Sequence, residues 1–595
     1  MNSDTACPEW VPMSEFIDRL LSRLLMVVAF LAAASLVAQY GFFLHQRYSG
    51  MVVWLDRGII IFFIAENFIR LLISREKLAY LKTHWIDFAF IAFLSTAIIS
   101  LRFFSSSEIV SASLAKLDIR SVTKAYIIAV QVYIGSVLFL KTVDANRFIA
   151  RLNLTAPQLV LVSFASVIGV GTLLLLMPRA TATGHTMPFI DALFTAASAT
   201  CVTGLIVVDT GSHFSRLGQG IILALIQIGG IGIMSLVAFS AVAIGRGIGM
   251  RERAMMKDVL SFDFVGEVTK LLRNIVVVTG ICELAGVLVL SRLWARDFAN
   301  PMEAFYYSLF HAVSAFCNAG FSLFTDSLEG FAGRADVVLT FAALIVIGGL
   351  GFLVISNMMS VLVGRIRRER PGTRLSLHSR MVLISSLILL VGGTLVFYVL
   401  ESGNSMSNLP PDRQMLTAFF TSVTARTAGF STMSMAALAT PTALLVVLLM
   451  FIGASPGGTG GGIKTSTMTV LVATLRSILR GRPNVEFLRR GLPQDVVNKA
   501  ICVVLLGLGL VFASTVVISI AEGKPLTEVL FEAVSAFGTV GLSRGITGDL
   551  TTPSKIVIIM TMFFGRIGPL TLGLAIGQRT IETSYSYPVE RVMIG

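Results

Sequence analysis

The chain has 595 residues, of which 55% are hydrophobic and only 14% carry a charged side chain. Soluble globular proteins carry about 25% charged residues, so this deficit excludes a soluble enzyme, a disordered regulator and a nucleic-acid-binding domain. It indicates an integral membrane protein with many helical spans. The net charge of +13 fits cytoplasmic loops rich in Arg and Lys. The five scattered cysteines indicate neither a disulfide framework nor a metal site.

Apolar segments long enough to cross a bilayer, about 20 residues each, recur along the whole chain. We expect spans near 22–43, 52–74, 86–104, 123–141, 157–177, 217–245, 271–293, 336–364, 381–400, 441–475, 499–520 and 553–577. Shorter apolar stretches near 188–202, 303–317, 412–426 and 527–539 suit re-entrant half-helices. Basic segments at 246–257, 365–380 and 476–499 should lie in the cytoplasm, which also predicts a cytoplasmic N-terminus.

A fourfold internal repeat decides the architecture. Its copies are FTAASATCVTG (194–204), FHAVSAFCNAG (310–320), FFTSVTARTAG (419–429) and FEAVSAFGTVG (531–541). Each is led by a proline and an acid, and each ends in a glycine. A second glycine, which we expect to open a span, follows 24 to 28 residues later at Gly229, Gly348, Gly453 and Gly565.

One repeat unit therefore consists of a span, a half-helix, a loop ending in glycine and a second span. The units occupy residues 151–255, 256–370, 371–490 and 491–595, which together form a core of residues 151–595. Two full crossings give all copies the same orientation, unlike inverted repeats, which need an odd number of spans. The sequence therefore predicts a pseudo-fourfold ring around a central axis.

Converging half-helices of this kind predict a cation site. Proline and an acid suit the N-terminus of each half-helix, so the opposite end directs its partial negative charge toward the axis. The glycine allows the loop to turn main-chain carbonyls inward, and rings of carbonyls suit a dehydrated monovalent cation. The loops contain no acidic side chain, which argues against a divalent-cation filter built from carboxylates.

The segments TCVTGL, CNAGF, RTAGF and GTVGL resemble the four degenerate selectivity filters of the Trk/Ktr/HKT superfamily of K⁺ transporters. The resemblance covers about 145–595, and the ending YPVERVMIG is most similar to the KtrB and TrkH membrane subunits. It implies an all-α polytopic membrane protein with four M1–P-loop–M2 units and about four extra N-terminal helices. The implied carbonyl-bearing filter residues are Val202, Thr203, Gly204, Asn318, Ala319, Gly320, Thr427, Ala428, Gly429, Thr539, Val540 and Gly541.

The resemblance also implies an activity and partners. The activity is K⁺ uptake, in Ktr members often dependent on Na⁺, with no tightly bound cofactor and no enzymatic reaction. A Ser replaces the first filter glycine in plant members that carry Na⁺, so Gly204 implies K⁺ selectivity. The implied partners are a second copy of the chain and a cytoplasmic TrkA/KtrA-like ring that binds ATP, ADP or NAD. That ring would dock on Arg365 and Arg368, for which lipid headgroups are the alternative.

Other functions stay open at this stage. A Na⁺ or unselective monovalent pathway is the alternative within transport, and a bacterial inner membrane is the expected location. A membrane-embedded enzyme would need paired acids, a histidine cluster or a nucleophile with a base at membrane depth, and the sequence shows none of these. A purely structural scaffold would not need four filter-like copies.

The stretch GASPGGTGGG at 453–462 interrupts the second span of the third unit. Six glycines and one proline oppose continuous helix by about 9 kcal/mol. Non-helical backbone at this depth must line a protein-enclosed or aqueous path, and the stretch resembles the intramembrane gating loop of the family. A harmless kink is the alternative. The implied gate residues are Gly453, Gly457, Gly458, Gly460, Gly461, Gly462, Lys464 and Arg566.

Two arginines lie within the predicted core of the membrane. Arg566 resembles the barrier that the family places beneath its filter, and the alternative is an arginine paired with an acid for packing. Arg426 directly precedes Thr427, and we expect it to point behind the filter because an axial arginine would repel the ion.

The N-terminal block of residues 1–150 carries charges inside its predicted spans. Phe63, Glu66, Arg70 and Asp87 resemble the charge-transfer centre of a voltage-sensor domain. Such a domain needs a helix with a basic residue at every third position, and here Lys116, Arg120 and Lys124 are spaced by four. The block is therefore interpreted as voltage-sensor-like and degenerate, or as a four-helix packing bundle.

Overall fold

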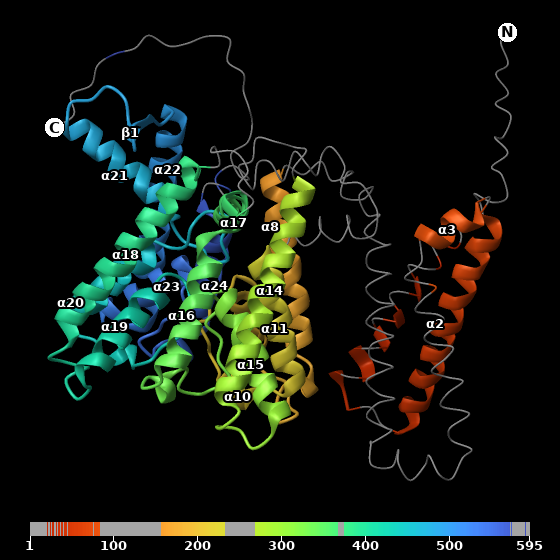
Figure 1. The fold of residues 1–595 in the computed structure, drawn as a ribbon. Coiled ribbons are helices and arrows are strands. Elements are labelled where there is room, and N and C mark those ends of the chain that lie inside the picture. Colours follow the sequence, from red (N-terminus) through yellow and green to blue (C-terminus); the bar gives the residue numbers. More distant parts are fainter. Residues whose placement is uncertain are drawn as a thin grey trace, which may run out of the picture.

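The computed structural model describes residues 46–74, 76–83, 88, 156–232, 268–366 and 374–569, with isolated positions between 21 and 43 and after 569. The described chain is almost entirely α-helical (Figure 1). A two-residue antiparallel hairpin, β1 (Glu486–Phe487) with β2 (Arg490–Gly491), interrupts the helices. The all-α class predicted from the sequence is confirmed.

Four consecutive groups of helices follow the repeat. Each group has a long helix, a half-helix and one or two helices of the second span. The long helices are α8 (Ala156–Leu175), α14 (Val268–Trp294), α18 (Leu377–Glu401) and α22 (Gln494–Glu522). The half-helices are α9 (Phe189–Thr200), α15 (Pro301–Phe316), α19 (Pro411–Thr424) and α23 (Leu526–Gly538). The second spans contain α11 (Arg216–Ile231), α16 (Ala335–Leu350), α17 (Phe352–Ile366), α20 (Thr440–Phe451), α21 (Thr465–Leu479) and α24 (Thr552–Ile567).

The first span of every unit agrees with the sequence. Among the residues that the structure describes, α8, α14, α18 and α22 are long and apolar enough to cross a membrane, and α16 with α17 makes a fifth span if the bent pair is counted as one. Short single turns connect the elements: α10 (Thr210–His213), η2 (Pro178–Ala180), η4 (Glu329–Phe331), η5 (Met435–Ala437) and η6 (Thr547–Asp549). These facts define a multi-pass membrane protein.

In units one, two and four the second spans differ from the prediction, which made them continuous helices. Helix α17 departs from α16 at 98° after Gly351 (Figure 1). Helices α11, α16 and α24 end directly before Gly232, Gly351 and Gly568, whose φ angles of 86°, 89° and 95° are readily adopted only by glycine. In unit three α20 ends at Phe451, and α21 begins at Thr465. The recurring glycines therefore lie at the end of the outer part of each second span. Our expectation that they open a span was wrong.

The units close into a ring through contacts between neighbours. The outer part of each second span packs against the half-helix of the next unit: α11 against α15, α16 against α19, α20 against α23, and α24 back against α9. Fully buried phenylalanines within the half-helices fill these contacts, namely Phe194, Phe310, Phe420 and Phe531. We call the side of the half-helix N-termini the outer side, and the side of α17 and α21 the inner side.

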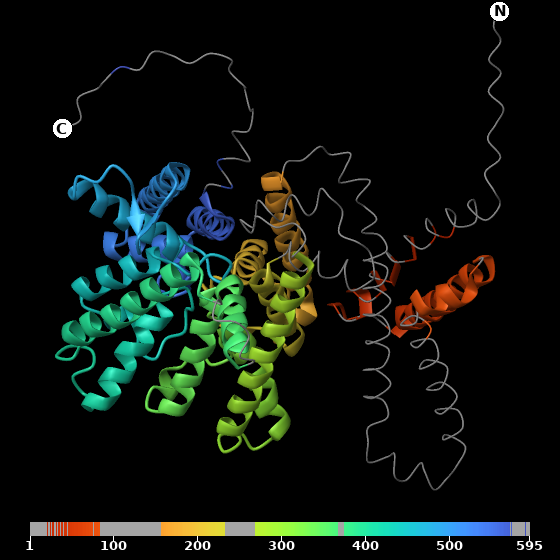
Figure 2. The ribbon, with the colours of Figure 1, turned by 45° about the horizontal axis from the view of Figure 1, so that its top comes forward.

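The N-terminal block is described only in part. Helices α2 (Gln46–Ile73) and α3 (Lys77–Thr83) lie to one side of the body formed by α8–α24 in both views (Figures 1 and 2). The guanidinium of Arg179 donates to the carbonyl of Gln39 at 2.9 Å and lies over the ring of Phe43, which connects this block to unit one. The predicted spans near 86–104 and 123–141 lie outside the described residues, apart from Phe88.

Candidate functional site

Four half-helices enter the protein from the outer side and stop at mid-depth. Proline occupies the N-cap or the first position of each, and an acid lies in each first turn: Asp191, Glu303, Asp412 and Glu528. Both features suit a helix N-terminus, which carries a partial positive charge. The second half of each helix is buried, so the negative C-terminal ends converge inside the protein.

The loops that follow the half-helices, which we call the re-entrant loops, share one unusual backbone conformation. Val202, Asn318, Thr427 and Thr539 have φ angles of 59°, 59°, 76° and 50°. The glycines two positions later, Gly204, Gly320, Gly429 and Gly541, have φ angles of 90°, 71°, 79° and 92°. A left-handed non-glycine residue costs about 1–3 kcal/mol and persists only where the surroundings impose it. Its occurrence in all four units therefore points to a functional conformation.

The glycines of the re-entrant loops meet the neighbouring loops around a closed ring. A Cβ placed on Gly204 would lie 2.4 Å from the carbonyl oxygen of Ala319, and one on Gly320 would lie 2.9 Å from that of Ala428. The same holds for Gly429 against Val540 at 2.4 Å, and for Gly541 against Thr203 at 2.3 Å. No side chain fits at these positions. The four loops therefore surround one axis with their backbones in van der Waals contact.

Hydrogen bonds from behind hold the re-entrant loops in place. The amides of Thr203, Ala319 and Val540 donate to the carbonyls of Ser198, Ser314 and Ser535 at 2.7–2.9 Å. The side chains of Ser198 and Ser535 also accept the glycine amides, each at 3.1 Å. The third unit differs, because Val423 stands where the others have serine, and Thr424 instead donates to the carbonyl of Phe430 at 2.7 Å. Backbone amides are thus held on the rear side of each loop.

Directly behind the loops, the four units carry different side chains. The position three residues before the loop glycine holds Cys201, Cys317, Arg426 and Gly538. The thiol of Cys317 lies within 3.8 Å of the side-chain oxygens of Gln227 and Glu283. The guanidinium of Arg426 donates to the hydroxyl of Ser386 on α18 at 3.1 Å, so it points behind the loop as expected.

The outer ends of two opposite loops are braced by polar side chains from the half-helices. His311 on α15 lies 3.1 Å from the hydroxyl of Ser322, two residues beyond Gly320. At the equivalent place in unit four, Glu532 accepts hydrogen bonds from Ser543 and from Thr547, the latter at 2.8 Å. The sequence analysis missed both residues, although each stands directly after the repeated phenylalanine.

The inner loop, residues 453–464 between α20 and α21, crosses beneath the ring. Its amides at Ser455 and Thr459 donate to the carbonyls of Gly349 and Gly348, and its Gly462 amide donates to the carbonyl of Gly565. These acceptors are carbonyls that the ends of α16 and α24 leave without intrahelical partners. The loop thus satisfies the broken helices of units two and four at once.

The inner loop also touches the ring directly. The amide of Gly461 donates to the hydroxyl of Thr539 at 2.9 Å. A Cβ on Gly460 would lie 1.9 Å from the hydroxyl of Thr427. The loop therefore lies against the inner mouth of the ring, and its glycines allow that approach. Of the predicted gate residues, Gly457 and Gly462 have positive φ angles of 71° and 67°, which explains the need for glycine there.

Two basic residues hold the inner loop in place. Arg566 donates to the carbonyl of Thr459 in the loop and to the carbonyl of Gly229 at the end of α11. Lys464 donates to the carbonyl of Gly460 at 2.7 Å. Among the described residues no carboxylate lies within 4.0 Å of either side chain. Arg566 thus connects units one, three and four.

The recurring glycines in the second spans have a packing role. A Cβ on Gly229, Gly348 or Gly565 would lie 1.9–2.0 Å from the carbonyl oxygen of the residue that ends the adjacent half-helix or precedes its end. The carbonyl oxygens concerned belong to Thr200, Phe316 and Phe537, respectively. The absent side chain lets each second span approach the half-helix of its own unit closely enough to fix the height of the loop.

The charged residues of the N-terminal block pair with neighbours in that block. Glu66 is buried and forms an ion pair with Arg70 one turn later on α2. Asp56 accepts hydrogen bonds from Ser35 and Gln39. Asp87 and the side chain of Phe63 lie outside what the structure describes. The charge-transfer centre therefore stays a prediction.

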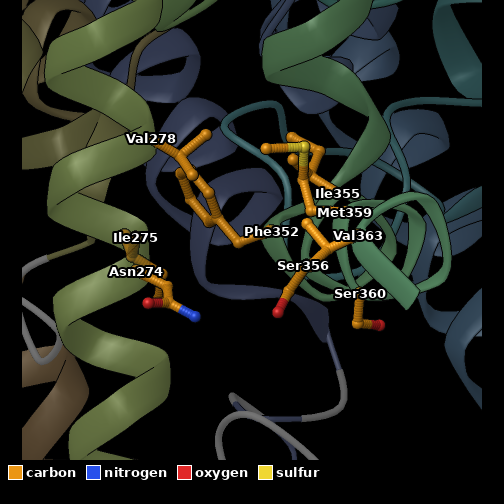
Figure 3. Close-up of a pocket in the computed structure, with 9 residues that line it drawn as sticks. All are labelled: Asn274, Ile275, Val278, Phe352, Ile355, Ser356, Met359, Ser360 and Val363. Atoms are coloured by element: carbon orange, nitrogen blue, oxygen red, sulfur yellow. The ribbon is translucent and has the colours of Figure 1, made fainter. Parts of the chain in front are cut away.

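An apolar pocket of about 350 Å³ lies between α14 and α17, just past the bend at Gly351 (Figure 3). It is lined by Val278 and Ile275 from α14 and by Phe352, Met359 and Val363 from α17. The pocket does not include a residue of the re-entrant loops or the inner loop. It arises because α17 turns away from the axis of its own unit.

A closed ring of four re-entrant backbone loops, fixed between membrane-spanning helices and covered from the inner side, defines a cation transport protein. Residues 121–580 match the family of cation transport proteins called TrkH. The Ktr system potassium uptake protein B of Bacillus subtilis is 36% identical over 456 residues, covering 76% of this chain and 100% of that protein. The potassium/sodium uptake protein NtpJ of Enterococcus hirae is 35% identical over 453 residues, covering 75% and 98%.

The fold has a counterpart among solved structures. The potassium transporter TrkH from Vibrio parahaemolyticus superimposes with a TM-score of 0.59 at 19% identity, covering 82% of this chain and 97% of that one. The chain belongs to the TrkH/Ktr family of potassium transporters. The family resemblance read from the filter-like motifs is thereby confirmed.

Proposed function

We propose that the protein is the membrane subunit of a K⁺ uptake system, and that the four re-entrant loops are its selectivity filter. The observation that carries this proposal is the ring of loop glycines, each in contact with a carbonyl-bearing backbone of the next loop. Carbonyl oxygens and the negative ends of four half-helices replace the hydration shell of a monovalent cation. Residues 202–204, 318–320, 427–429 and 539–541 would supply those carbonyls.

The inner loop is the proposed gate, and Arg566 is proposed to hold it closed. A conducting pathway along the axis must pass the place where the loop crosses beneath the ring. The loop is held by backbone hydrogen bonds to helix ends and by Arg566 and Lys464, and these bonds are exchangeable for water. A kink without function would not need contacts to two other units.

The remaining parts of the proposal concern surroundings and partners. We place the protein in a bacterial inner membrane with the N-terminus and the arginine-rich loops in the cytoplasm. A second copy of the chain and a nucleotide-binding cytoplasmic ring are the proposed partners, the latter acting on α21 and the inner loop. Two members with related names, a potassium and a potassium/sodium uptake protein, support a monovalent cation as cargo. They keep Na⁺ as the second candidate ion or as a coupled ion.

The N-terminal block is proposed to bias this gate in a voltage-sensor-like manner, with a packing bundle as the alternative. The ion pair of Glu66 with Arg70 gives α2 a buried charge arrangement. Rb⁺ flux into proteoliposomes at imposed potentials would test the proposal. Voltage dependence that weakens in Arg70→Gln supports a sensor, whereas identical voltage dependence in both proteins supports the bundle.

The central experiment is growth of a K⁺-uptake-deficient bacterium on low K⁺, with Rb⁺ and Na⁺ uptake followed in parallel. The native chain should restore growth and take up Rb⁺ in preference to Na⁺. Gly204→Ser should lose that preference, because its Cβ would displace the carbonyl of Ala319. Gly220→Ser on α11, where a Cβ meets no atom within 4 Å, is the matched control. Unchanged selectivity in Gly204→Ser would contradict the filter assignment.

A further inference from the structure

The four units carry three neutral residues and one cation at the same place behind the re-entrant loops. Cys201, Cys317 and Gly538 stand three residues before the loop glycine in units one, two and four, and Arg426 stands there in unit three. Cys201 and Cys317 follow directly after their half-helices, Gly538 ends its own, and Arg426 lies two residues past the end of α19. The repeat thus offers an internal comparison, since the same backbone position accepts both neutral and charged side chains.

The guanidinium of Arg426 is enclosed by the protein without an acidic partner. Its contacts among the described residues are with the hydroxyl of Ser386 at 3.1 Å and the carbonyl of Ser386 at 3.5 Å. Its Nε is buried and has no hydrogen-bond partner there. No described carboxylate lies within 4.0 Å. The positive charge is therefore not cancelled by a neighbouring side chain.

Water screens this charge only slightly. A cavity of about 20 Å³ adjoins Arg426 and is lined by Ser386, by Gly349 and Leu350 at the end of α16, and by Ala454 of the inner loop. That volume accommodates about one water molecule. The cavity lies between the rear of the third loop and the inner loop, so the charge acts on both through a medium of low polarizability, in which Coulomb interactions are strong.

Because Arg426 lies just beyond the end of α19, its charge acts against the partial negative charge of that helix end. The C-terminal end of a helix carries a partial charge of roughly −0.5, which attracts a cation. A full positive charge two residues past the end of α19 exceeds that partial charge. In the third quarter of the ring, the charge of Arg426 therefore opposes the attraction of the helix end for a cation.

We propose that Arg426 lowers the occupancy of the filter by K⁺ and so sets the balance between ion affinity and turnover. Conduction requires a site that is attractive enough to enter and weak enough to leave. Four unopposed helix ends would bind the ion more tightly, and the arginine offsets one of them. This inference rests on the proposed function, because it assumes that the ion passes through the ring.

The test uses the residue that units one and two already carry at this place. Arg426→Cys should lower the KM for Rb⁺ uptake about two- to fivefold, without raising the maximal rate per molecule. Arg426→Lys keeps the charge and should keep the native KM. Uptake is measured in proteoliposomes containing the full chain and is normalised to the protein present, so that a lower yield does not alter the KM.

Three outcomes would overturn the proposal. The first is an unchanged KM in Arg426→Cys. The second is an equal shift in Arg426→Lys, which would assign the effect to shape and not to charge. The third is failure of both Arg426→Cys and Arg426→Gln to accumulate while Arg426→Lys does, which would make the residue a folding requirement.

The proposed function fails separately from this inference. If Gly204→Ser leaves selectivity unchanged, the ring is not the filter, whatever Arg426 does. If Gly204→Ser loses selectivity and Arg426→Cys keeps the native KM, the ring is the filter and only the role of Arg426 is wrong.

Discussion

The ring of re-entrant loops and the layer directly beneath it are built from the same four units in opposite ways. In the ring every unit supplies a left-handed residue and a glycine at the same two positions. Beneath it, unit three supplies a glycine-rich loop and unit four supplies Arg566, whereas units one and two supply helix-end carbonyls that accept their hydrogen bonds. The ring therefore follows the fourfold repeat, whereas the layer beneath it is asymmetric.

In the function proposed above, the difference reflects what each layer does to an ion. A dehydrated cation needs ligands on all sides, so each unit must present its backbone alike. A barrier needs one movable part and fixed partners for it. Carbonyls left unpaired in a dry membrane interior cost several kcal/mol each. If the inner loop is the gate, as we propose, it leaves its place only when water reaches those carbonyls, so that opening and hydration of the path are one event.

Of the changes proposed, shortening the inner loop should have the largest effect, and that effect should be on ion flux and not on selectivity. Deletion of 457–461 removes the segment that contacts Thr427 and Thr539, so Rb⁺ flux through the protein alone should rise about tenfold or more. Ion selectivity should stay native, because the ring is untouched. Flux into proteoliposomes without any partner protein measures both. Deletion of 488–489 at the tip of the β1–β2 hairpin is the control, since it lies outside the ring and the inner loop. Equal flux in both variants would contradict a gate.

Filling the space between a second span and its half-helix should cost stability. Gly229→Ala places a Cβ 2.0 Å from the carbonyl of Thr200, and overpacking of this kind costs about 1–3 kcal/mol. Gly220→Ala on the same helix meets no atom within 4 Å and should stabilise it by up to about 1 kcal/mol. Thermal unfolding in detergent compares the two. A midpoint that rises equally in both variants would show that helix propensity, and not packing, governs α11.

Much of the outer layer could be predicted from the sequence because its signals are local. Apolar stretches too short to cross, each with a leading proline and a terminal glycine, defined the half-helices. The repeat then fixed their common orientation. The breaks in the second spans were foreseen only in unit three, where six glycines cluster. In the other units the only signal was a second glycine three residues after the recurring one, as in Gly229 and Gly232. We therefore interpreted these segments as ordinary apolar helices.

The inner layer could not be predicted because its contacts are long-range. The partner of Arg566 in unit one, the carbonyl of Gly229, is 337 residues away and has no side chain to mark it. The hydrogen bonds that support the outer ends of the loops were not predicted for a related reason. His311 and Glu532 read as isolated polar residues on an apolar face, and only the folded loops show that each reaches a serine two residues past a glycine.

Removing the brace in unit four should produce the smallest effect, confined to one quarter of the ring. Glu532→Ala deletes an acceptor for Ser543 and Thr547, and leaving the buried hydroxyl of Thr547 and the half-buried one of Ser543 without it costs about 1–3 kcal/mol in the local loop conformation. The preference for Rb⁺ over Na⁺ should fall a few-fold. Glu532→Gln keeps the acceptor oxygen and should stay near native. Thr195→Val at the same place in unit one should change nothing, because that hydroxyl bonds back to Asp191 on its own helix at 2.9 Å.

Competitive uptake of Rb⁺ and Na⁺ in these three variants separates hydrogen bonding from charge at the outer end of the ring. Loss of preference in Glu532→Gln as large as in Glu532→Ala would show that the carboxylate acts as a charge near the ion path. Native preference in all three would show that the loop of unit four is held from behind, by Ser535 and the Val540 amide, without help from its outer end. Because units two and four face each other across the ring, a brace that matters in one predicts the same for His311 in the other.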